Sequence, residues 1–452
     1  MRPVVCVDFG STFTKVGVVD VTDGRLVDTA AHRTTVDSDV MDGLDAALGV
    51  LRDRNPTLDL SERVACSSAG GGLRLAVVGY ERAVTAEAGY RVGLSAGARV
   101  VHVSAGPMAP ADVAGLLADS PDLVLLAGGT DGGNAEVLLG NARALSRAGV
   151  TVPVVVAGNA AVCDQVVRVL RRGRVPTVAT ANVLPRIGVL DPVHARAAIR
   201  EVFIRHVIGG KHLSERVDLA SFVRAATPDA VLAGVELLAD GHGGVAGRGD
   251  VVVVDVGGAT TDVYSVVTPD AEEAGLHRDV VETLWRSRTV EGDLGVRWNA
   301  VGIVDAAVAE RLVEPVDGPQ LRRAAERRAA EPGFLPDSPA EAAVDTRLAS
   351  LAVTVALRRH ARPHTSGEAR YPGKDLRRVR LVVGSGGVFR HGRPDDVTVM
   401  LAPAVADIGG GWRVPERATT TVDQRYVLAA AGLLAAEFPV AAAALLEREL
   451  IG

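Results

Sequence analysis

Cysteine is scarce in this chain, with three residues in 452. Cys6, Cys66 and Cys163 stand far apart in apolar sequence, a pattern that fits neither a disulfide framework nor CxxC metal ligation. We therefore expect three small core side chains in a reducing compartment. Lysine is scarce as well, because only three of the 49 basic residues are lysines and arginine is the default cation.

Long apolar runs and targeting signals are also lacking. Apolar runs such as Val251 to Val254 have the length of a strand, far below the roughly 20 residues that span a bilayer. The N-terminus enters a strand directly, and Asp8 interrupts any candidate signal region. These features predict a cytoplasmic protein without a membrane span.

The chain has no basic excess and no Walker A pattern. Its net charge is −6, which argues against nucleic acid as the main partner, since binding phosphate backbones needs a basic stripe. The pattern GxxxxGK[ST] occurs nowhere, which argues against a P-loop enzyme. At 452 residues the chain exceeds one typical domain severalfold, so we expect more than one hydrophobic core.

One pattern occurs twice. Residues 4–20 read VVCVDFGSTFTKVGVVD, and residues 251–267 read VVVVDVGGATTDVYSVV. Each copy is a β-branched strand, a turn of small residues and a second strand, which predicts a β-hairpin. The copies align without a gap, Asp8 on Asp255 and Gly10 on Gly257, so we expect two related lobes. Two unrelated hairpins are the alternative, which the shared register disfavours.

The residue types in both turns suit a bound polyphosphate. Glycines leave room for a phosphate, and successive backbone N–H groups in such turns form anion-binding nests. Hydroxyls in the turns add hydrogen-bond donors. The residues that we expect to bind phosphate are Gly10, Ser11, Thr12, Thr14, Gly257, Gly258, Thr260 and Thr261.

The charged residues of the two hairpins predict a magnesium ion beside that phosphate. Asp8 and Asp255 end their strands, and Mg²⁺ prefers one or two carboxylates plus several waters. We expect both to hold magnesium mostly through water. Lys15 takes the place that Asp262 has in the second copy, and its compact charge suits phosphate. Catalytic roles are therefore expected for Asp8, Lys15, Asp255 and Asp262.

A third glycine-rich element lies near the C-terminus. Residues 380–391 read RLVVGSGGVFRH, a strand running into Gly384, Ser385, Gly386 and Gly387. Glycines there would let a base and ribose approach the backbone, although a tight strand-to-helix turn explains the pattern equally well. The chain closes with an alanine-rich helical stretch, which Pro439 interrupts and in which Gly432 would let helices cross closely between lobes.

In this order, the elements resemble the superfamily of actin, hexokinase and heat-shock-chaperone ATPases. The resemblance implies a two-lobed actin-like α/β fold with duplicated ribonuclease-H-like lobes, and ATP with Mg²⁺ bound in the cleft between them. In that superfamily the aspartates that match Asp8, Asp255 and Asp262 position magnesium and the attacking water.

Residues 96–185 alternate apolar strands with helical patterns, which predicts an inserted α/β unit with a parallel sheet. We expect the first lobe in residues 1–95 and 426–452, the inserted unit in 96–210, and the second lobe with the adenosine loop in 211–425. The arginine-rich run from Leu321 to Arg328 is interpreted as an exposed helix face.

Several stretches together resemble one narrower family, the methylaspartate (glutamate) mutase accessory proteins. They include DFGSTFTK, LLAGGTDGGN, VDVGGATTDVYS and RTVEGDLGVRWNA. The resemblance implies a weak ATPase that reactivates an adenosylcobalamin-dependent carbon-skeleton mutase, with the mutase subunits as partners. A small-molecule kinase and a nucleotide-gated scaffold with little hydrolysis remain alternatives. The sequence does not indicate the oligomeric state.

Overall fold

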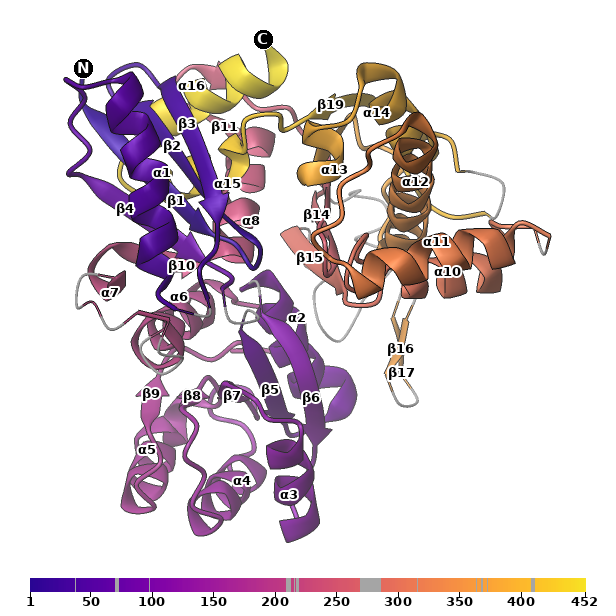
Figure 1. Cartoon of the computed structure of the whole chain (residues 1–452). Helices are drawn as coiled ribbons and strands as arrows, with labels where there is room; N and C mark the ends of the chain where they lie inside the picture. The colour runs from indigo at the N-terminus through magenta and orange to yellow at the C-terminus, as the bar shows by residue number, and fades with distance from the viewer. Residues whose placement is uncertain are drawn as a thin grey trace.

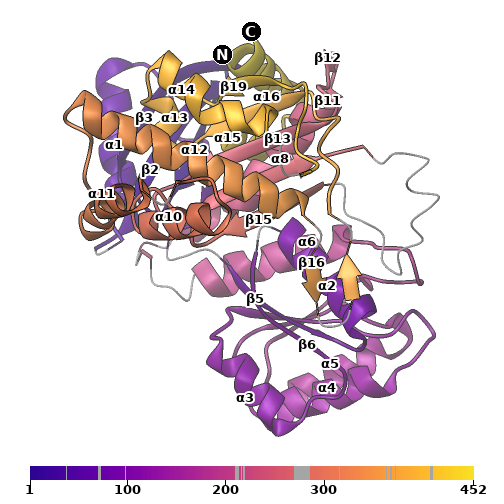
Figure 2. The same cartoon turned by 90° about the vertical axis from the view of Figure 1, so that its right-hand side faces the viewer.

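The computed structural model describes residues 1–36, 38–69, 73–96, 98–208, 213–214, 216, 219–268, 286–314, 316–362, 364–366, 369–371, 373–407 and 411–452. Three five-stranded sheets form its frame (Figure 1). Two sheets belong to the lobes, and the third belongs to the inserted unit. Both termini lie at the end of the molecule opposite to the inserted unit, as Figures 1 and 2 show.

The first lobe is built on a sheet with the order β10-β4-β1-β2-β3. Strands β1 to β3 are antiparallel, whereas β4 and β10 run parallel to β1. The strands are β1 (Pro3–Phe9), β2 (Phe13–Asp20), β3 (Arg25–Arg33), β4 (Arg63–Ser67) and β10 (Val223–Ala226). Its helices are α1 (Val40–Arg54), α7 (Leu219–Phe222), α15 (Val427–Leu434) and α16 (Pro439–Leu446), followed by a π-helical turn (Glu447–Ile451).

The second lobe repeats this sheet, with the order β15-β14-β13-β18-β19. Again three antiparallel strands are followed by two strands parallel to the first. The strands are β13 (Val251–Val256), β14 (Thr261–Val266), β15 (Arg286–Glu291), β18 (Leu381–Ser385) and β19 (Thr419–Val422). The helices are α10 (Ala300–Ala309), α11 (Gly318–Ala330), α12 (Pro339–Ala361), α13 (Gly387–Arg390) and α14 (Pro394–Leu401), with a 3₁₀ turn at Ala402–Val405.

The equal strand order confirms the predicted fold. In both sheets the strands follow the order 3-2-1-4-5, counted within each lobe, and the duplicated sequence forms strands 1 and 2 of each. This is the two-lobed actin-like arrangement with duplicated ribonuclease-H-like lobes. Two short hairpins extend from it, β11 (Gly241–His242) with β12 (Val245–Ala246) and β16 (His364–Ser366) with β17 (Ala369–Tyr371).

The inserted unit has a fully parallel sheet with the order β6-β5-β7-β8-β9. Its strands are β5 (Arg74–Gly79), β6 (Arg99–Ala105), β7 (Leu123–Leu126), β8 (Val154–Val156) and β9 (Thr177–Ala179). Its helices are α2 (Glu87–Ser95), α3 (Pro110–Ala118), α4 (Glu136–Arg147), α5 (Cys163–Arg172) and α6 (Val193–Val202); shorter turns span Arg82–Ala86, Ala160–Val162 and Phe203–Ile208.

The sheet pairing places two boundaries differently from the sequence-based division. Strand β5 lies in the range 1–95, expected to be first lobe, yet it pairs with β6 and β7 of the inserted sheet. Strand β10 lies in the range 211–425, expected to be second lobe, yet it pairs with β4 of the first. The sequences of β5 and β10 do not indicate which sheet each strand joins, so only the observed pairing assigns them.

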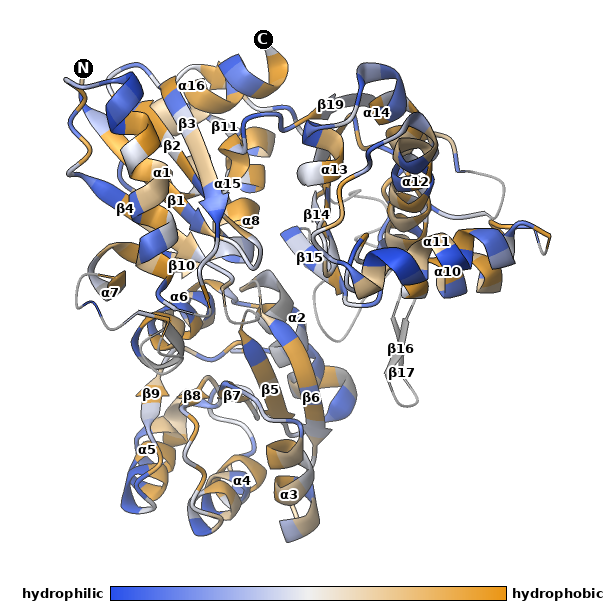
Figure 3. Ribbon diagram, viewed as in Figure 1, coloured by the Kyte–Doolittle hydropathy of each residue, from blue (hydrophilic) through white to orange (hydrophobic). Residues whose placement is uncertain are grey.

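Hydrophobic packing joins these units. One core continues from the first lobe into the inserted unit, from Val5 through Leu75 to Leu125. Another core lies between the lobes and contains Val4 and Val253 from the two first strands. Helix α5 has a polar side and an apolar side (Figure 3), and the apolar side packs on the outer face of the inserted sheet.

Helix α8 (Thr227–Asp240) crosses α15 between the lobes. A Cβ on Gly234 would lie 2.1 Å from the Leu428 carbonyl oxygen, and one on Gly432 would lie 1.8 Å from that of Ala230. The crossing therefore needs glycine in both helices. This confirms the predicted role of Gly432, and Pro439 opens α16 after the predicted interruption.

Candidate functional site

The first predicted hairpin joins β1 and β2, and Asp8 pairs with Lys15 across the two strands. In its turn the Gly10 N–H donates to the Phe13 carbonyl at 3.1 Å. The Gly10 carbonyl accepts from the Thr34 hydroxyl at 2.8 Å, which fixes it on one side of the turn.

The second hairpin joins β13 and β14 and pairs Asp255 with Asp262. Its turn closes in the same way, because the Gly257 N–H donates to the Thr260 carbonyl at 2.9 Å. The segment after β15 fixes three successive carbonyls of this turn. Val296 N donates to Gly257 O, Arg297 N and Trp298 N donate to Gly258 O, and Asn299 Nδ2 donates to Ala259 O.

Fixing a carbonyl also orients the amide that follows it. In a planar trans peptide the C=O and the next N–H point in opposite directions. The N–H groups of Gly258, Ala259 and Thr260 therefore point away from residues 296–299, and within the described residues none of the three donates a hydrogen bond. Three such amides in sequence form a nest that suits an anion.

The predicted hydroxyl donors divide into two groups. Ser11 and Thr12 are exposed, and Thr260 is half-buried. Thr14 and Thr261, however, are fully buried. The Thr14 hydroxyl meets that of Thr34 at 3.2 Å, and the Thr261 hydroxyl donates to the Leu294 carbonyl at 2.5 Å.

The burial of Thr14 and Thr261 corrects the expectation that both would face a phosphate. Strand side chains alternate between the two faces of a sheet, so each threonine points into its lobe while the following residue points out. Those following residues are Lys15 and Asp262, the charged pair that distinguishes the copies.

Lys15 lies at the centre of a charged cluster. Its ammonium is 3.0 Å from Asp8 Oδ2 and 4.3 Å from the centre of the Tyr426 ring. Burial alone would lower the pKa of Lys15, but Asp8, Tyr426 and Asp255 outweigh this effect and raise it. The cation therefore acts on the carboxylates of both lobes. We call Asp8, Lys15, Asp255 and Tyr426 the interlobe site.

Asp255 lies in surroundings that disfavour its negative charge. Burial raises the pKa of its carboxyl to about 6. Lys15 opposes the rise, and three more carboxylates add to it: Asp262, Asp8 and Asp423. Neighbouring carboxylates that raise the pKa of Asp255 suit a bound cation, which would relieve their repulsion. Because Mg²⁺ needs only one or two carboxylates, Asp255 and Asp8 fit such an ion.

Asp262 has a different environment from the other predicted catalytic residues. Its Oδ1 accepts from Arg288 Nη2 at 2.8 Å, and its Oδ2 accepts from the Thr260 hydroxyl at 3.3 Å. Arg288 is buried on the neighbouring strand β15. Asp262 thus joins two strands through an ion pair, and both of its oxygens already accept hydrogen bonds.

The predicted adenosine loop lies directly beside the second turn. Ser385 pairs with Asp255 across the parallel strands β18 and β13. Gly386 has φ 108°, and a Cβ there would lie 2.2 Å from the Val256 carbonyl oxygen and 3.1 Å from Asp255 Oδ1. Only glycine fits at this position. Gly384 and Ser385 are buried within the strand, whereas Gly387 is exposed.

Four residues at the site have no counterpart among the predicted ones. Thr227 donates its hydroxyl to Asp8 Oδ1 at 2.6 Å. Asp423 accepts from the Val427 and Leu428 amides and so caps α15. The Tyr426 ring lies between the cations of Lys15, at 4.3 Å, and Arg390, at 4.7 Å. An aspartate just before an apolar helical stretch is a capping signal, but nothing in the sequence indicates the other three.

The described parts of the chain contain neither a cluster of three or more metal-binding side chains nor a membrane helix. Among these residues no group of three or more His, Cys, Asp or Glu side chains is placed to hold a metal ion. The same residues contain no helix that is long and apolar enough to cross a membrane.

Comparison with known proteins identifies the family. The sequence model of the MutL protein family matches residues 4–450. The chain belongs to the MutL family. Protein MutL of Clostridium tetanomorphum is 33% identical over 463 residues, and the alignment covers 100% of both chains. The resemblance to the glutamate mutase accessory proteins is thereby confirmed, since MutL proteins form that family.

Solved structures give more distant matches to this chain. A nucleotide-free acetone carboxylase structure has 17% identity and a TM-score of 0.41, covering 96% of this chain and 70% of that one. The activator of 2-hydroxyisocaproyl-CoA dehydratase from Clostridium difficile, with bound ADPNP, has 8% identity and a TM-score of 0.34, covering 97% and 95%. At these scores the assignment of the fold rests on the strand order of the two lobes.

Proposed function

We propose that this chain binds ATP with Mg²⁺ at the interlobe site and hydrolyses it slowly. The observation that carries the proposal is the second turn, whose three amides have no acceptor within the described residues and lie beside Asp255. The first turn repeats the closing hydrogen bond in the other lobe. Two such turns, with Lys15 between their aspartates, suit a polyphosphate that bridges the lobes.

The chain's own residues would act mainly by positioning and electrostatics, as in phosphoryl transfer generally. The turn amides and the Lys15 ammonium would stabilise phosphate charge. Asp8 and Asp255 would hold the magnesium ion through water, and the ion would supply further positive charge. Asp8 or Asp255 would also orient the attacking water, whereas Asp262 would support the second turn from its ion pair with Arg288.

The glycine loop would receive the adenosine. Gly386 lies against Val256 with no room for a side chain, and Gly387 is exposed next to it. A flat base and ribose can approach such a backbone closely. The loop and the second turn are neighbours through β18 and β13, so one nucleotide would contact both.

The biological role that we propose is reactivation of an adenosylcobalamin-dependent carbon-skeleton mutase. Membership of the MutL family supports a mutase as partner. Nucleotide binding and hydrolysis would change the relative orientation of the two lobes. This movement would loosen the bound mutase enough for its damaged cofactor to exchange. The cytoplasm is the compartment that we propose for both proteins.

A paired assay tests this function. ATP hydrolysis is measured with and without glutamate mutase that has been inactivated with damaged cobalamin, and recovery of mutase activity is followed in the same samples. We expect stimulated hydrolysis and ATP-dependent recovery. Asp255→Ala should abolish both, whereas Asp53→Ala, on the exposed side of α1, should abolish neither. ATP binding without stimulation or recovery would contradict the reactivating role and leave nucleotide binding intact.

A further inference from the structure

The amides of the second turn depend on residues 296–299, because this segment fixes the carbonyls of Gly257, Gly258 and Ala259. The segment belongs to the stretch RTVEGDLGVRWNA, to which the sequence alone assigns no chemistry. Its own position is therefore decisive for the geometry of the turn.

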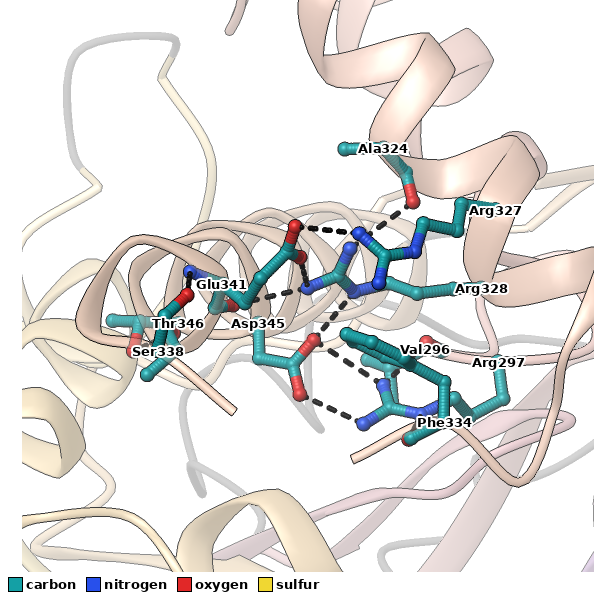
Figure 4. Close-up of polar contacts among 11 residues, drawn as sticks. Val296, Arg297, Ala324, Arg327, Arg328, Phe334, Ser338, Glu341, Asp345 and Thr346 are labelled. Atoms are coloured by element: carbon teal, nitrogen blue, oxygen red, sulfur yellow. Dashed lines mark hydrogen bonds and ion pairs between the residues drawn. The ribbon is translucent and has the colours of Figure 1, made fainter. Parts of the chain in front are cut away.

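Arg297 anchors this segment to the interior of the second lobe (Figure 4). Its Nη2 donates to Asp345 Oδ2 at 2.7 Å, and its Nη1 approaches Oδ1 at 3.3 Å. Nη1 also donates to the Val296 carbonyl, and Nε donates to that of Phe334. The guanidinium thus has partners in three directions while its backbone N–H holds Gly258.

A second arginine fixes Asp345 from the opposite side, as Figure 4 shows. Arg328 is 0% exposed, and its Nε donates to Asp345 Oδ1 at 2.6 Å. Its Nη2 donates to the side chain and the carbonyl of Glu341, and its Nη1 to the Ala324 carbonyl. Helices α11 and α12 and the segment are therefore joined through one carboxylate. The finding corrects the expectation of an exposed arginine face at Arg328 alone, because Arg322, Arg323 and Arg327 are exposed as expected.

Stability alone does not explain this cluster. Taking charges out of water is costly, and apolar residues of similar volume often stabilise a protein as well or better than a buried ion pair. Paired guanidinium–carboxylate hydrogen bonds do, however, fix direction, which apolar contacts do not. The cluster holds Arg297, whose backbone N–H donates to the Gly258 carbonyl of the second turn. To bind a phosphate, the amides of residues 258–260 in that turn must all point the same way.

We propose that Arg297 is a positioning residue for nucleotide phosphate. Held by Asp345 and Arg328, it keeps the Gly258 carbonyl turned inward and so aims the amides of residues 258–260 at the phosphate. This inference rests on the proposed ATP binding. According to this inference, the amides of the second turn contact the phosphate, and a buried triad of Arg297, Asp345 and Arg328 orients them without touching the ligand.

Replacing the three charged residues by apolar ones tests whether the triad orients the turn or only stabilises the fold, because apolar residues can keep the stability but not the orientation. The variant is Arg297→Met/Asp345→Leu/Arg328→Met, and Arg297→Lys keeps a charge but loses the paired geometry. Arg327→Ala is the matched control, because Arg327 binds Glu341 in the same cluster but contacts neither Asp345 nor Arg297. ATP affinity, melting temperature and hydrogen exchange with and without ATP·Mg²⁺ are measured for each.

The wild type and the control should show ATP-induced protection in two peptides, 257–263 and 384–390. The triple variant should keep its melting temperature and its protection in 384–390, lose protection in 257–263, and bind ATP about tenfold to a hundredfold more weakly, the effect of one or two charge-assisted hydrogen bonds. For Arg297→Lys, both the ATP affinity and the protection of 257–263 should lie between those of the wild type and those of the triple variant.

Three outcomes count against the inference. Equal protection of 257–263 in the triple variant and the wild type would overturn it. If the triple variant unfolds, the test rests on Arg297→Lys. Wild-type ATP affinity and wild-type protection of 257–263 in that folded variant would overturn the inference as well. A wild type without protection in either peptide would remove the proposed ATP binding and this inference together.

Discussion

The Thr227 hydroxyl donates to Asp8 Oδ1 at 2.6 Å, from a position 219 residues further along the chain. Thr227 is the first residue of α8. The last residue of that helix, Asp240, forms an ion pair with Arg286 on β15 of the second lobe, with an N–O distance of 2.7 Å. One helix thus links the first aspartate of the interlobe site to the opposite lobe.

Thr227→Val should weaken ATP binding and hydrolysis. Valine has the shape of threonine but leaves one carboxylate oxygen of Asp8 without this donor, and a hydrogen bond to a charged group contributes about 1.5–3 kcal/mol. We expect kcat/KM for ATP to fall about tenfold to a hundredfold. Steady-state kinetics measure the effect, and Thr419→Val, which removes an exposed hydroxyl in the second lobe, should have none.

Asp255→Asn should stabilise the protein near neutral pH while abolishing its activity. The folded-state pKa of Asp255 is about 6, above the ordinary 3.8 of the unfolded state. As pH rises from about 4 to 6, the unfolded chain loses this proton first, so the wild type loses stability in that window. Asparagine should remove this loss of stability, so the free energy of unfolding of Asp255→Asn should exceed that of the wild type by about 1–3 kcal/mol at pH 7.

Urea denaturation of the wild type and Asp255→Asn at pH 4, 5, 6 and 7 measures this difference. The two free energies of unfolding should converge at pH 4 and separate towards pH 7. A constant difference at all four values would show that burial and the neighbouring carboxylates do not raise the pKa of Asp255.

Lys15 and Asp8 should be strongly coupled energetically. Their charged atoms lie 3.0 Å apart, with side-chain exposures of 28% and 12%. Lys15→Met leaves Asp8 and Asp255 without their cation and should cost about 1–3 kcal/mol, less than for a fully buried pair. A double-mutant cycle with Asp8→Asn isolates the interaction. Additive effects of the two substitutions would mean that the pair contributes nothing to stability.

The Lys15 interaction also has a defined pH dependence. The pKa of Lys15 is raised on folding, so the stability that it contributes is fully present below the unfolded value of 10.5. It should be lost only as pH rises above that value. In the Asp255→Asn background, which removes the carboxyl whose pKa Lys15 lowers, the difference that Lys15→Met makes should therefore stay constant from pH 7 to pH 9.

Gly432→Ala should destabilise the helix crossing between the lobes. A Cβ there would lie 1.8 Å from the Ala230 carbonyl oxygen, and overpacking of this kind costs about 1–3 kcal/mol or more. Gly140→Ala in α4 is the control, since nothing lies within 4 Å of its Cβ position. That control should gain up to about 1 kcal/mol from helix propensity. Thermal unfolding of both variants compares the effects.

Arg200→Ala should loosen the inserted unit from α8. Arg200 on α6 lies 2.5 Å from the buried Asp229, whose other ion-pair partner, Arg196, is 3.6 Å away. Without Arg200 the buried carboxylate keeps only the longer contact. Limited proteolysis should then cleave between the inserted unit and the lobes faster than in wild type. Arg205→Ala, which breaks only an exposed ion pair with Glu201, should leave the rate unchanged.

Much of the frame was predictable from local patterns. Both duplicated stretches form the hairpins that their pattern predicts, and the equivalent positions pair in both, Asp8 with Lys15 and Asp255 with Asp262. The four apolar runs after residue 96 are parallel strands as expected. Alternation along a strand is a local property, so it is visible in the sequence. The same alternation, applied to the second strand of each hairpin, would have placed Thr14 and Thr261 inside.

By itself, the sequence determined the duplication, the two hairpin turns, the glycine loop and the family, because each depends on residues that are close together in the chain. Tertiary structure alone decided which strands belong to which sheet, and it brought Thr227, Tyr426 and Arg390 to the interlobe site. It also turned an apparently exposed arginine, Arg328, into the buried partner of Asp345. Those relationships depend on contacts between distant segments, and the free energy of such contacts comes from burial and charge pairing that no local pattern encodes.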